Sequence, residues 1–310
     1  MKKSSIIDAV FVIMAVLLAF VVKAYILSYD HSYQDDMRAY EGYYNVLSDT
    51  LYSGFIDLDA RQFIGSNDWL SNHTFFFFSK LVSFDFFSTM VYMFYTYLVA
   101  LIFVKLKLRL AALIFPFTFY SIGIASSGLR LTMAIACFLF LYTNRRYYFS
   151  SIAVLYHAQI IPIYTLAFDK SKAKKTFLIS IALVAIFLSP SLVPKFIYYY
   201  HSNTIAIFTS FVSLYGVFSI LIAGFLSCRK KSLKLILYIL PTAFAILILG
   251  AGRFNIILYF IFLLWLLECD RVNYKGVILL YMFLVYDTFK GVMFIESLID
   301  GNNGYSGIVF

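Results

Sequence analysis

The chain has 310 residues, of which 62% are hydrophobic and only 13% are charged. A soluble domain has about a quarter of its residues charged. This composition therefore excludes an ordinary soluble protein and predicts an all-α polytopic membrane protein. The formal net charge of +9 does not indicate nucleic-acid binding, because the basic residues lie in short loops between apolar runs, where they orient a membrane protein. The three cysteines show neither a disulfide framework nor a metal-ligand pattern, so no metal and no cofactor are expected.

The apolar runs predict the membrane-spanning helices, each of which needs about 20 apolar residues. The first run, 6–28, lacks a small-residue cleavage site, so we interpret it as a signal anchor. The later runs are 86–104, 110–124, 130–143, 176–190, 204–226, 233–250, 254–268 and 276–294. Several are short, which indicates helices that end at an internal cavity. We expect about 9–10 transmembrane helices in a single integral membrane domain, residues 1–310.

Clusters of basic residues predict the orientation of these helices. Beyond Lys2 and Lys3, the clusters lie at 105–109, 145–146, 170–175, 229–234 and 271–275. Short loops rich in lysine and arginine remain on the cytoplasmic side. The chain is therefore expected to be a multi-pass protein of the cytoplasmic membrane with its N-terminus in the cytoplasm.

The largest polar segment, 29–73, lies outside the membrane in this orientation. It holds half of the chain's 16 acidic residues, interleaved with tyrosines. Residues 36–56 have the pattern of an amphipathic helix that lies on a membrane surface. Tyrosine rings stack on sugar rings, and carboxylates accept hydrogen bonds from sugar hydroxyls, so this external loop is a candidate glycan-binding surface.

Several candidate residues flank this loop. Asp35 and Asp36 follow the first span, and Tyr40 comes one helical turn later. A carboxylate at this position can deprotonate an acceptor hydroxyl; the alternative is a helix cap with acids in the first turn. At the other end, His73 can shape the same mouth, whereas capping is the simpler interpretation of Asn72.

The apolar stretch 147–168 has basic residues on both sides, which a normal crossing would place on opposite faces of the membrane. A re-entrant hairpin of two half-helices keeps both clusters inside, with its turn near His157 and its second half beginning at Pro162. Polar backbone at this depth needs protein or a water-filled cavity around it. His157 can donate to a phosphate or move a proton; the alternative is a histidine satisfied by a neighbouring helix.

Two arginines, Arg130 and Arg253, begin apolar runs on the side opposite the basic clusters, and each follows a glycine-containing small-residue stretch. Arginine near the hydrocarbon is costly and is a functional-site candidate by default. Guanidinium stays charged and binds phosphate oxygens through a two-pronged fork. The pair therefore predicts a lipid-linked phosphate or diphosphate substrate. The alternative is an interfacial anchor, which is also the simpler interpretation of Lys290, a candidate third phosphate contact.

The sequence Gly128-Leu129-Arg130-Leu131-Thr132-Met133-Ala134 resembles the Arg-Gln-x-x-Ala signature of the EpsG family of bacterial polysaccharide polymerases, relatives of the Wzy-type O-antigen and capsule polymerases. Leu131 departs from that signature, because it stands where the family has glutamine. The histidine and basic loop that follow the signature match His157 and 170–175. An earlier Asp-x-x-x-Tyr element matches Asp36 and Tyr40, and the late arginine matches Arg253. The family's Glu-Pro element is replaced around Asn72-His73.

The resemblance implies a fold similar to the C-type membrane glycosyltransferases, in the bacterial inner membrane. It implies an inverting polymerase that joins oligosaccharide repeat units on undecaprenyl diphosphate at the outer face, for O-antigen, capsule or exopolysaccharide. The lipid-linked donor and acceptor are then its partners, with a chain-length regulator as a further candidate partner. The expected catalytic residues are Arg130, Arg253, His157 and Asp36, and the expected substrate-binding residues are Tyr40, Asp35, His73 and Lys290.

Other functions fit the same cations. A flippase or exporter of lipid-linked sugars also needs a positively charged cavity, although transporters often contain internal repeats, and this sequence shows none. An O-antigen ligase or a sugar acyltransferase would act on a similar lipid-linked substrate. The absence of a P-loop pattern argues against ATP-driven transport.

Overall fold

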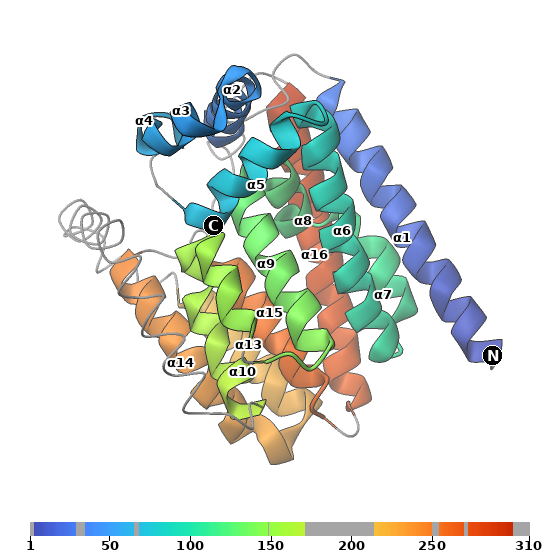
Figure 1. Ribbon diagram of the computed structural model, residues 1–310. Coiled ribbons are helices and arrows are strands. Elements are labelled where there is room, and N and C mark those ends of the chain that lie inside the picture. Colours follow the sequence, from blue (N-terminus) through green and yellow to red (C-terminus); the bar gives the residue numbers. More distant parts are fainter. Residues whose placement is uncertain are drawn as a thin grey trace. The chain divides into compact units, whose positions relative to one another are not determined.

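The computed structural model describes residues 3–28, 35–64, 68–147, 149–170, 214–249, 254–269 and 272–299. Within these ranges the chain is helical and contains no strand, which confirms the all-α prediction (Figure 1). The predicted span 176–190, the first part of the span 204–226 and Arg253 lie outside the described residues.

Among the described residues, three helices are long and apolar enough to cross a membrane. They are α1 (Lys3–Leu27), α6 (Phe84–Lys105) and α16 (Tyr274–Ile299), close to the predicted runs 6–28, 86–104 and 276–294. Ser83 begins α6 by accepting a hydrogen bond from the amide of Phe86, the usual way to satisfy an otherwise unpaired amide. The chain thus has the helices of a polytopic membrane protein.

The predicted run 110–124 is a broken helix. It consists of α7 (Arg109–Ile114), η1 (Phe115–Phe117) and α8 (Phe119–Ser127), and its two parts meet at 47°. The break follows from Pro116, which has no amide hydrogen to continue a helix, and from Thr118, whose hydroxyl accepts from Ser121 and starts α8. Taken as one bent span, this pair is a fourth candidate span among the described residues, by length and composition.

The described residues divide into two compact units, and α9 (Leu129–Thr143) and α16 each contribute to both. The first unit holds the described residues up to Leu139, those of Leu155–His157, and those from Leu284 onward. The second holds Phe140–Val154 and the described residues of Ala158–Phe283.

The second unit is built around one buried helix. Its helices are α13 (Tyr215–Ser227), α14 (Ser232–Leu249) and α15 (Phe254–Leu266), the last two at the predicted spans 233–250 and 254–268. Almost every residue of α15 is buried, as expected for a helix that is apolar all round. Gly224 permits the close packing of α13, because a Cβ there would lie 2.1 Å from Leu235 Cδ2.

The stretch 147–168 folds back on itself. It forms η2 (Phe149–Leu155), η3 (Ala158–Ile163) and the start of α10 (Tyr164–Lys170). The Tyr164 hydroxyl donates to the carbonyl oxygens of Ser150 and Ser151 at 3.0 and 3.1 Å, so the two limbs lie side by side. The two limbs are short helices, largely of the 3₁₀ type in keeping with Pro162 inside η3, and His157 lies in the turn between η2 and η3. The depth of this hairpin in the membrane stays a prediction.

Two polar contacts fix the direction of the chain in the first unit. Arg109, at the start of α7, forms an ion pair with Asp8 near the beginning of α1 at 2.6 Å. The buried Lys23, near the end of α1, donates to the Ala125 carbonyl near the end of α8 at 2.7 Å. The broken helix α7–α8 therefore runs from the N-terminal to the C-terminal end of α1. Arg130, one turn after α8, lies at the end away from Arg109.

Four short helices cover that same end of the first unit: α2 (Asp35–Asp49), α3 (Tyr52–Asp57), α4 (Arg61–Ile64) and α5 (Trp69–Ser79). The apolar side of α2 packs on protein, where Tyr44 meets Phe84 and Phe87 at ring distances of 5.4 and 5.6 Å. The expected single surface helix over 36–56 is thus two helices, the first of which covers a protein core.

The tyrosines of α2 belong to this core. Tyr40, Tyr43 and Tyr44 are all nearly inaccessible to solvent. Burial raises the pKa of Tyr43 and that of Tyr44 to about 12, so both hydroxyls stay neutral at physiological pH. These three rings hold the helices α2–α5 together and do not form the open glycan-stacking surface that the sequence suggested.

Candidate functional site

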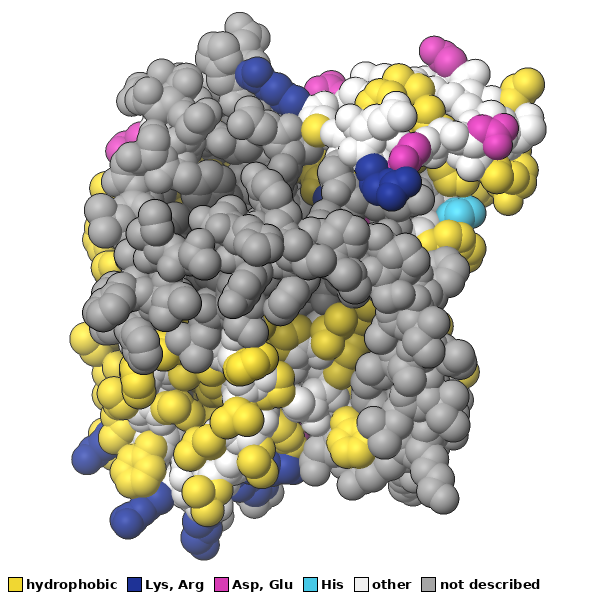
Figure 2. All heavy atoms as spheres, turned by 90° about the vertical axis from the view of Figure 1, so that its left-hand side faces the viewer, with side chains coloured by type: hydrophobic (Ala, Val, Ile, Leu, Met, Phe, Trp, Pro, Cys, Tyr) yellow, Lys and Arg dark blue, Asp and Glu magenta, His cyan; other side chains and the backbone are white. Residues whose placement is uncertain are grey.

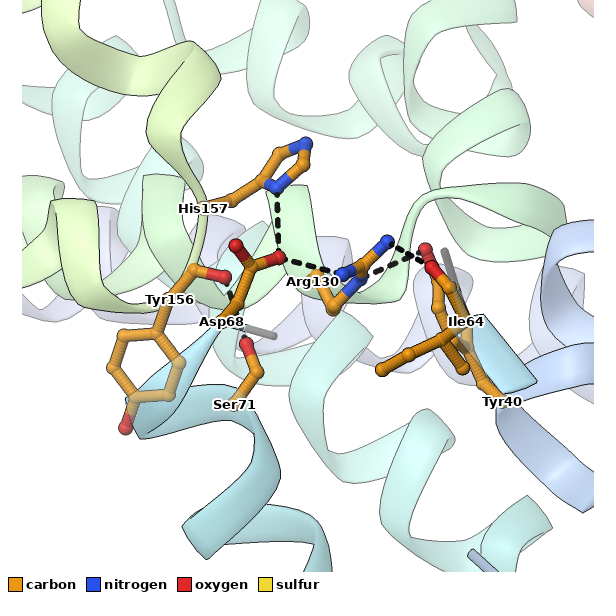
Figure 3. Close-up of polar contacts among 7 residues, drawn as sticks. All are labelled: Tyr40, Ile64, Asp68, Ser71, Arg130, Tyr156 and His157. Carbon is orange, nitrogen blue, oxygen red and sulfur yellow. Dashed lines mark hydrogen bonds and ion pairs between the residues drawn. The ribbon is translucent and has the colours of Figure 1, made fainter. Parts of the chain in front are cut away.

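Arg130, in the first turn of α9, lies at the centre of a buried polar cluster (Figure 3). Its Nη1 donates to Asp68 Oδ2 at 2.6 Å, its Nη2 to the Ile64 carbonyl at 3.0 Å, and its Nε to the Tyr40 hydroxyl at 3.1 Å. The guanidinium also lies 5.1 Å from the centre of the Tyr40 ring. Arg130 is 4% exposed and Asp68 6% exposed, so this ion pair is screened very little by water.

The Asp68 carboxylate is available to pair with Arg130 because it does not cap helix α5. Asp68 immediately precedes α5, where an aspartate normally accepts a hydrogen bond from an amide of its own helix. The Asp68 side chain makes no such capping bond, although its backbone carbonyl accepts from Asn72 at 3.0 Å. The carboxylate is turned toward Arg130 instead, which couples the start of α5 to the start of α9.

His157 completes the cluster from the turn between η2 and η3. Its Nδ1 lies 3.2 Å from Asp68 Oδ2, the same oxygen that pairs with Arg130. An ionised carboxylate can only accept, so Nδ1 carries the hydrogen when Asp68 is charged. The preceding residue is held as well, because Ser71 on α5 donates to the Tyr156 carbonyl at 2.8 Å. Helix α5 therefore positions His157 through both Ser71 and Asp68.

The charges of the cluster depend on one another. A buried carboxylate or guanidinium without a partner costs several kcal/mol, so Asp68 and Arg130 each need the other in this closed arrangement. An anionic ligand that binds Arg130 has to compete with Asp68 or share the fork with it. A diphosphate can do this, because it brings more charge and more acceptor oxygens than one carboxylate.

The structure brings together three of the residues expected to form the site. Arg130, His157 and Tyr40 all belong to the cluster, although Tyr40 and Arg130 are 90 positions apart. Tyr40, expected to bind substrate, is buried instead, and it contacts the guanidinium through its hydroxyl and its ring. The sequence does not single out Asp68, because it is one of many acids in the 29–73 loop. The resemblance places the family's Glu-Pro element around Asn72-His73, four residues after Asp68.

The other expected site residues have different surroundings or fall outside the description. His73 is not part of the cluster. Its Nδ1 lies 2.8 Å from the Trp69 carbonyl oxygen, and its ring packs on Phe55. Lys290 on α16 lies over the ring of Tyr286 at 5.1 Å. Asp35 and Asp36 form the first turn of α2, but their side chains, like Arg253, lie outside the described residues.

Within the described ranges, no three histidine, cysteine, aspartate or glutamate side chains are placed to hold a metal ion. The cluster itself places one guanidinium and one imidazole around a single carboxylate, so it offers hydrogen-bond donors and one fixed positive charge to an anion. No protein family, curated protein or solved structure matches the chain. The buried cluster and the sequence motif around Arg130 are therefore the features that bear on function.

Proposed function

We propose that the chain is a membrane-embedded, metal-independent glycosyltransferase that polymerises lipid-linked oligosaccharide repeat units. The observation that supports this most is the buried Arg130–Asp68–His157 cluster at one end of the apolar helices. Charged side chains at such a position are costly and are retained for substrate contact or catalysis. The EpsG-like motif around Arg130 is the second support.

The position of the cluster fits a lipid-linked substrate. Arg130 lies at the end of the first unit away from the Arg109–Asp8 ion pair. If Arg109 faces the cytoplasm, as the basic clusters predict, Arg130 lies at the outer face. A diphosphate anchored by its lipid is held at this depth, and its sugars extend toward helices α2–α5.

The proposed reaction is a direct displacement at the anomeric carbon of the donor glycan. The acceptor hydroxyl oxygen bonds to C1 while the bond from C1 to the diphosphate oxygen breaks, and the leaving diphosphate keeps the electron pair. Arg130 and Arg253 stabilise the charge that grows on the diphosphate, and His157 assists by donating a hydrogen bond. Preorganised cations favour this transition state over the ground state. The hydroxyl proton passes to Asp36, the proposed base.

The test is glycan profiling of a deletion strain complemented with the wild type, Arg130→Lys or Arg253→Ala. Lysine keeps the positive charge that Asp68 requires, so Arg130→Lys should be made and inserted normally. It cannot reproduce the three-way donation to Asp68, Ile64 and Tyr40, so polymerisation should fall at least about 100-fold, the scale of losing one transition-state contact. The expected gel shows lipid carrying a single repeat instead of a ladder.

The matched control is Arg109→Lys, which makes the same change at the opposite end of the unit and keeps the charge paired with Asp8. It should give the wild-type ladder. A wild-type ladder from Arg130→Lys would overturn the assignment. Deletion cells that carry no surface sugar would indicate a flippase, and cells that build long chains without attaching them to their final acceptor would indicate a ligase.

A further inference from the structure

The outer segment of the first unit exposes several large apolar side chains that its own core does not need. Leu51 is 79% exposed, Ile56 66% and Tyr52 58%, all in or beside α3. Phe55 is buried and stacks on Phe76 of α5 at 4.7 Å, and the Tyr52 ring meets the same Phe76 ring at 5.7 Å. The short helix therefore packs on α5 and still exposes Leu51, Ile56 and much of Tyr52.

Apolar side chains are also exposed along one of the membrane-spanning helices. Along α6, exposed apolar side chains recur at helical spacing: Phe86 (55%), Met90 (44%), Phe94 (44%) and Tyr97 (40%). In a helix that crosses the membrane such a stripe faces lipid. Just before α6, Leu81 is 61% exposed in the turn after α5, which places an apolar side chain at the outer end of this stripe.

Lys80 joins the turn that carries Leu81 to the turn that carries Leu51. Its ammonium donates to the carbonyls of Ser48 and Thr50, both at 2.7 Å, at the end of α2. Leu51 follows directly in the chain. The start of α3 is therefore held beside the turn that leads into α6, close to the outer end of its lipid-facing stripe.

The residues that follow α3 are charged. Asp59 and Arg61 form an exposed ion pair at 2.8 Å, and the hydrogen bonds from Arg61 hold the pKa of Asp59 below its ordinary value, so the carboxylate stays ionised. Figure 2 shows hydrophobic side chains exposed on this segment, at the upper right, with acidic side chains among them. Trp69 and Tyr52, both exposed on the segment, are residue types enriched at membrane interfaces.

We propose that α3, together with the Trp69 end of α5, is an in-plane anchor whose apolar face lies at the boundary between lipid headgroups and acyl chains. The occupant of this face is the bilayer itself, because its exposed apolar residues lie beside the turn that begins the lipid-facing stripe of α6 and include residue types enriched at membrane interfaces. The anchor is distinct from the cluster around Arg130, and the proposal does not depend on polymerase activity.

The chain's two tryptophans make a direct test possible, because Trp265 is fully buried and supplies a constant background. The starting protein is Trp69→Phe, reconstituted in bilayers of phosphatidylcholine with or without bromine atoms near the headgroup end of the acyl chains. Ile56→Trp and, independently, Leu51→Trp are added to it. For each, the added fluorescence should fall about twofold or more in the brominated bilayer, as expected for a side chain at the interface.

The matched control is Gly42→Trp, on exposed α2 backbone where an added Cβ meets nothing within 4 Å. Its fluorescence should be quenched by aqueous iodide and not by brominated lipid. If Ile56→Trp and Leu51→Trp are instead quenched by iodide alone, the face lies in water and the proposal is wrong. Quenching by neither agent would mean that protein, such as a second copy of the chain, covers the face, which also overturns it.

Discussion

At the scale of single residues, the ion pair between Arg130 and Asp68 is the contact on which the candidate site depends. The two residues are 62 positions apart, and each is almost completely shielded from solvent. Their attraction and the cost of burying them nearly cancel, so the pair does more for geometry than for stability. Removing one partner is different, because the other is then left as an uncompensated buried charge.

Asp68→Asn should therefore destabilise the protein by about 3–5 kcal/mol, since the amide leaves the Arg130 charge without its counterion. Replacing both residues together, as Asp68→Leu with Arg130→Met, should recover most of this loss. Apparent melting temperatures of Asp68→Leu, Arg130→Met and the double variant in detergent would measure the coupling, because the double variant should lose much less stability than the sum of the two single losses. Additive losses would contradict the interdependence of the pair.

The sequence predicted Arg130 and His157 for a physical reason that did not apply to Asp68. A charged or titratable side chain within an apolar run is costly and is therefore conspicuous. Asp68 lies in a polar segment among half of the chain's acids, where one carboxylate looks like any other. Its turn away from capping α5 and toward Arg130 is a long-range contact, and the sequence holds no local signal for it.

At the scale of elements, the break between α7 and α8 governs how the first unit packs. Helix α16 approaches this break closely: Asp287 accepts from the amide of Tyr120 at 3.4 Å, and Gly291 follows one turn later. A Cβ on Gly291 would lie 2.3 Å from the Phe117 carbonyl oxygen and 3.0 Å from the Phe119 amide nitrogen. Both neighbours are backbone atoms, so neither can rotate away.

Gly291→Ala should destabilise the protein by about 1–3 kcal/mol, the usual cost of overpacking a tight contact. Gly42→Ala is the control, because it makes the same substitution in a helix where an added Cβ meets nothing within 4 Å. There alanine should be neutral or stabilising by up to about 1 kcal/mol, since it is the better helix former. Equal melting temperatures for the two variants would refute the close approach of α16 to the break.

The elements were predicted well where hydropathy alone decides them, and less well where backbone chemistry does. The apolar runs located α1 and α6 to within a few residues, because a span of this kind needs only about 20 apolar positions. The run 110–124 was expected to be continuous, yet Phe115-Pro116-Phe117 contained the signal for a break. The amphipathic pattern of α2 did not predict whether its apolar face packs on protein or on lipid, because the same pattern is compatible with both.

At the scale of the whole molecule, the orientation in the membrane decides which compartment the candidate site faces. Helix α6 has 22 residues, so its ends are separated by about 33 Å at 1.5 Å per residue, close to the thickness of the hydrocarbon core. Its first residue, Phe84, packs on Tyr44 of α2, and its last is the exposed Lys105. Exposed positions on α2 and at Lys105 therefore report on opposite faces.

Cysteine labelling can test this orientation after the three native cysteines, all free and partly buried, have been replaced. A membrane-impermeant maleimide added to intact cells should label Asp49→Cys, on exposed α2, and should label Lys105→Cys only after permeabilisation. This outcome would place Arg130, at the α2 end, on the outer face, where the proposed polymerisation would take place. The reverse pattern would put the cluster on the cytoplasmic face and would contradict polymerisation there, whatever the glycan gel of the Arg130→Lys strain had shown.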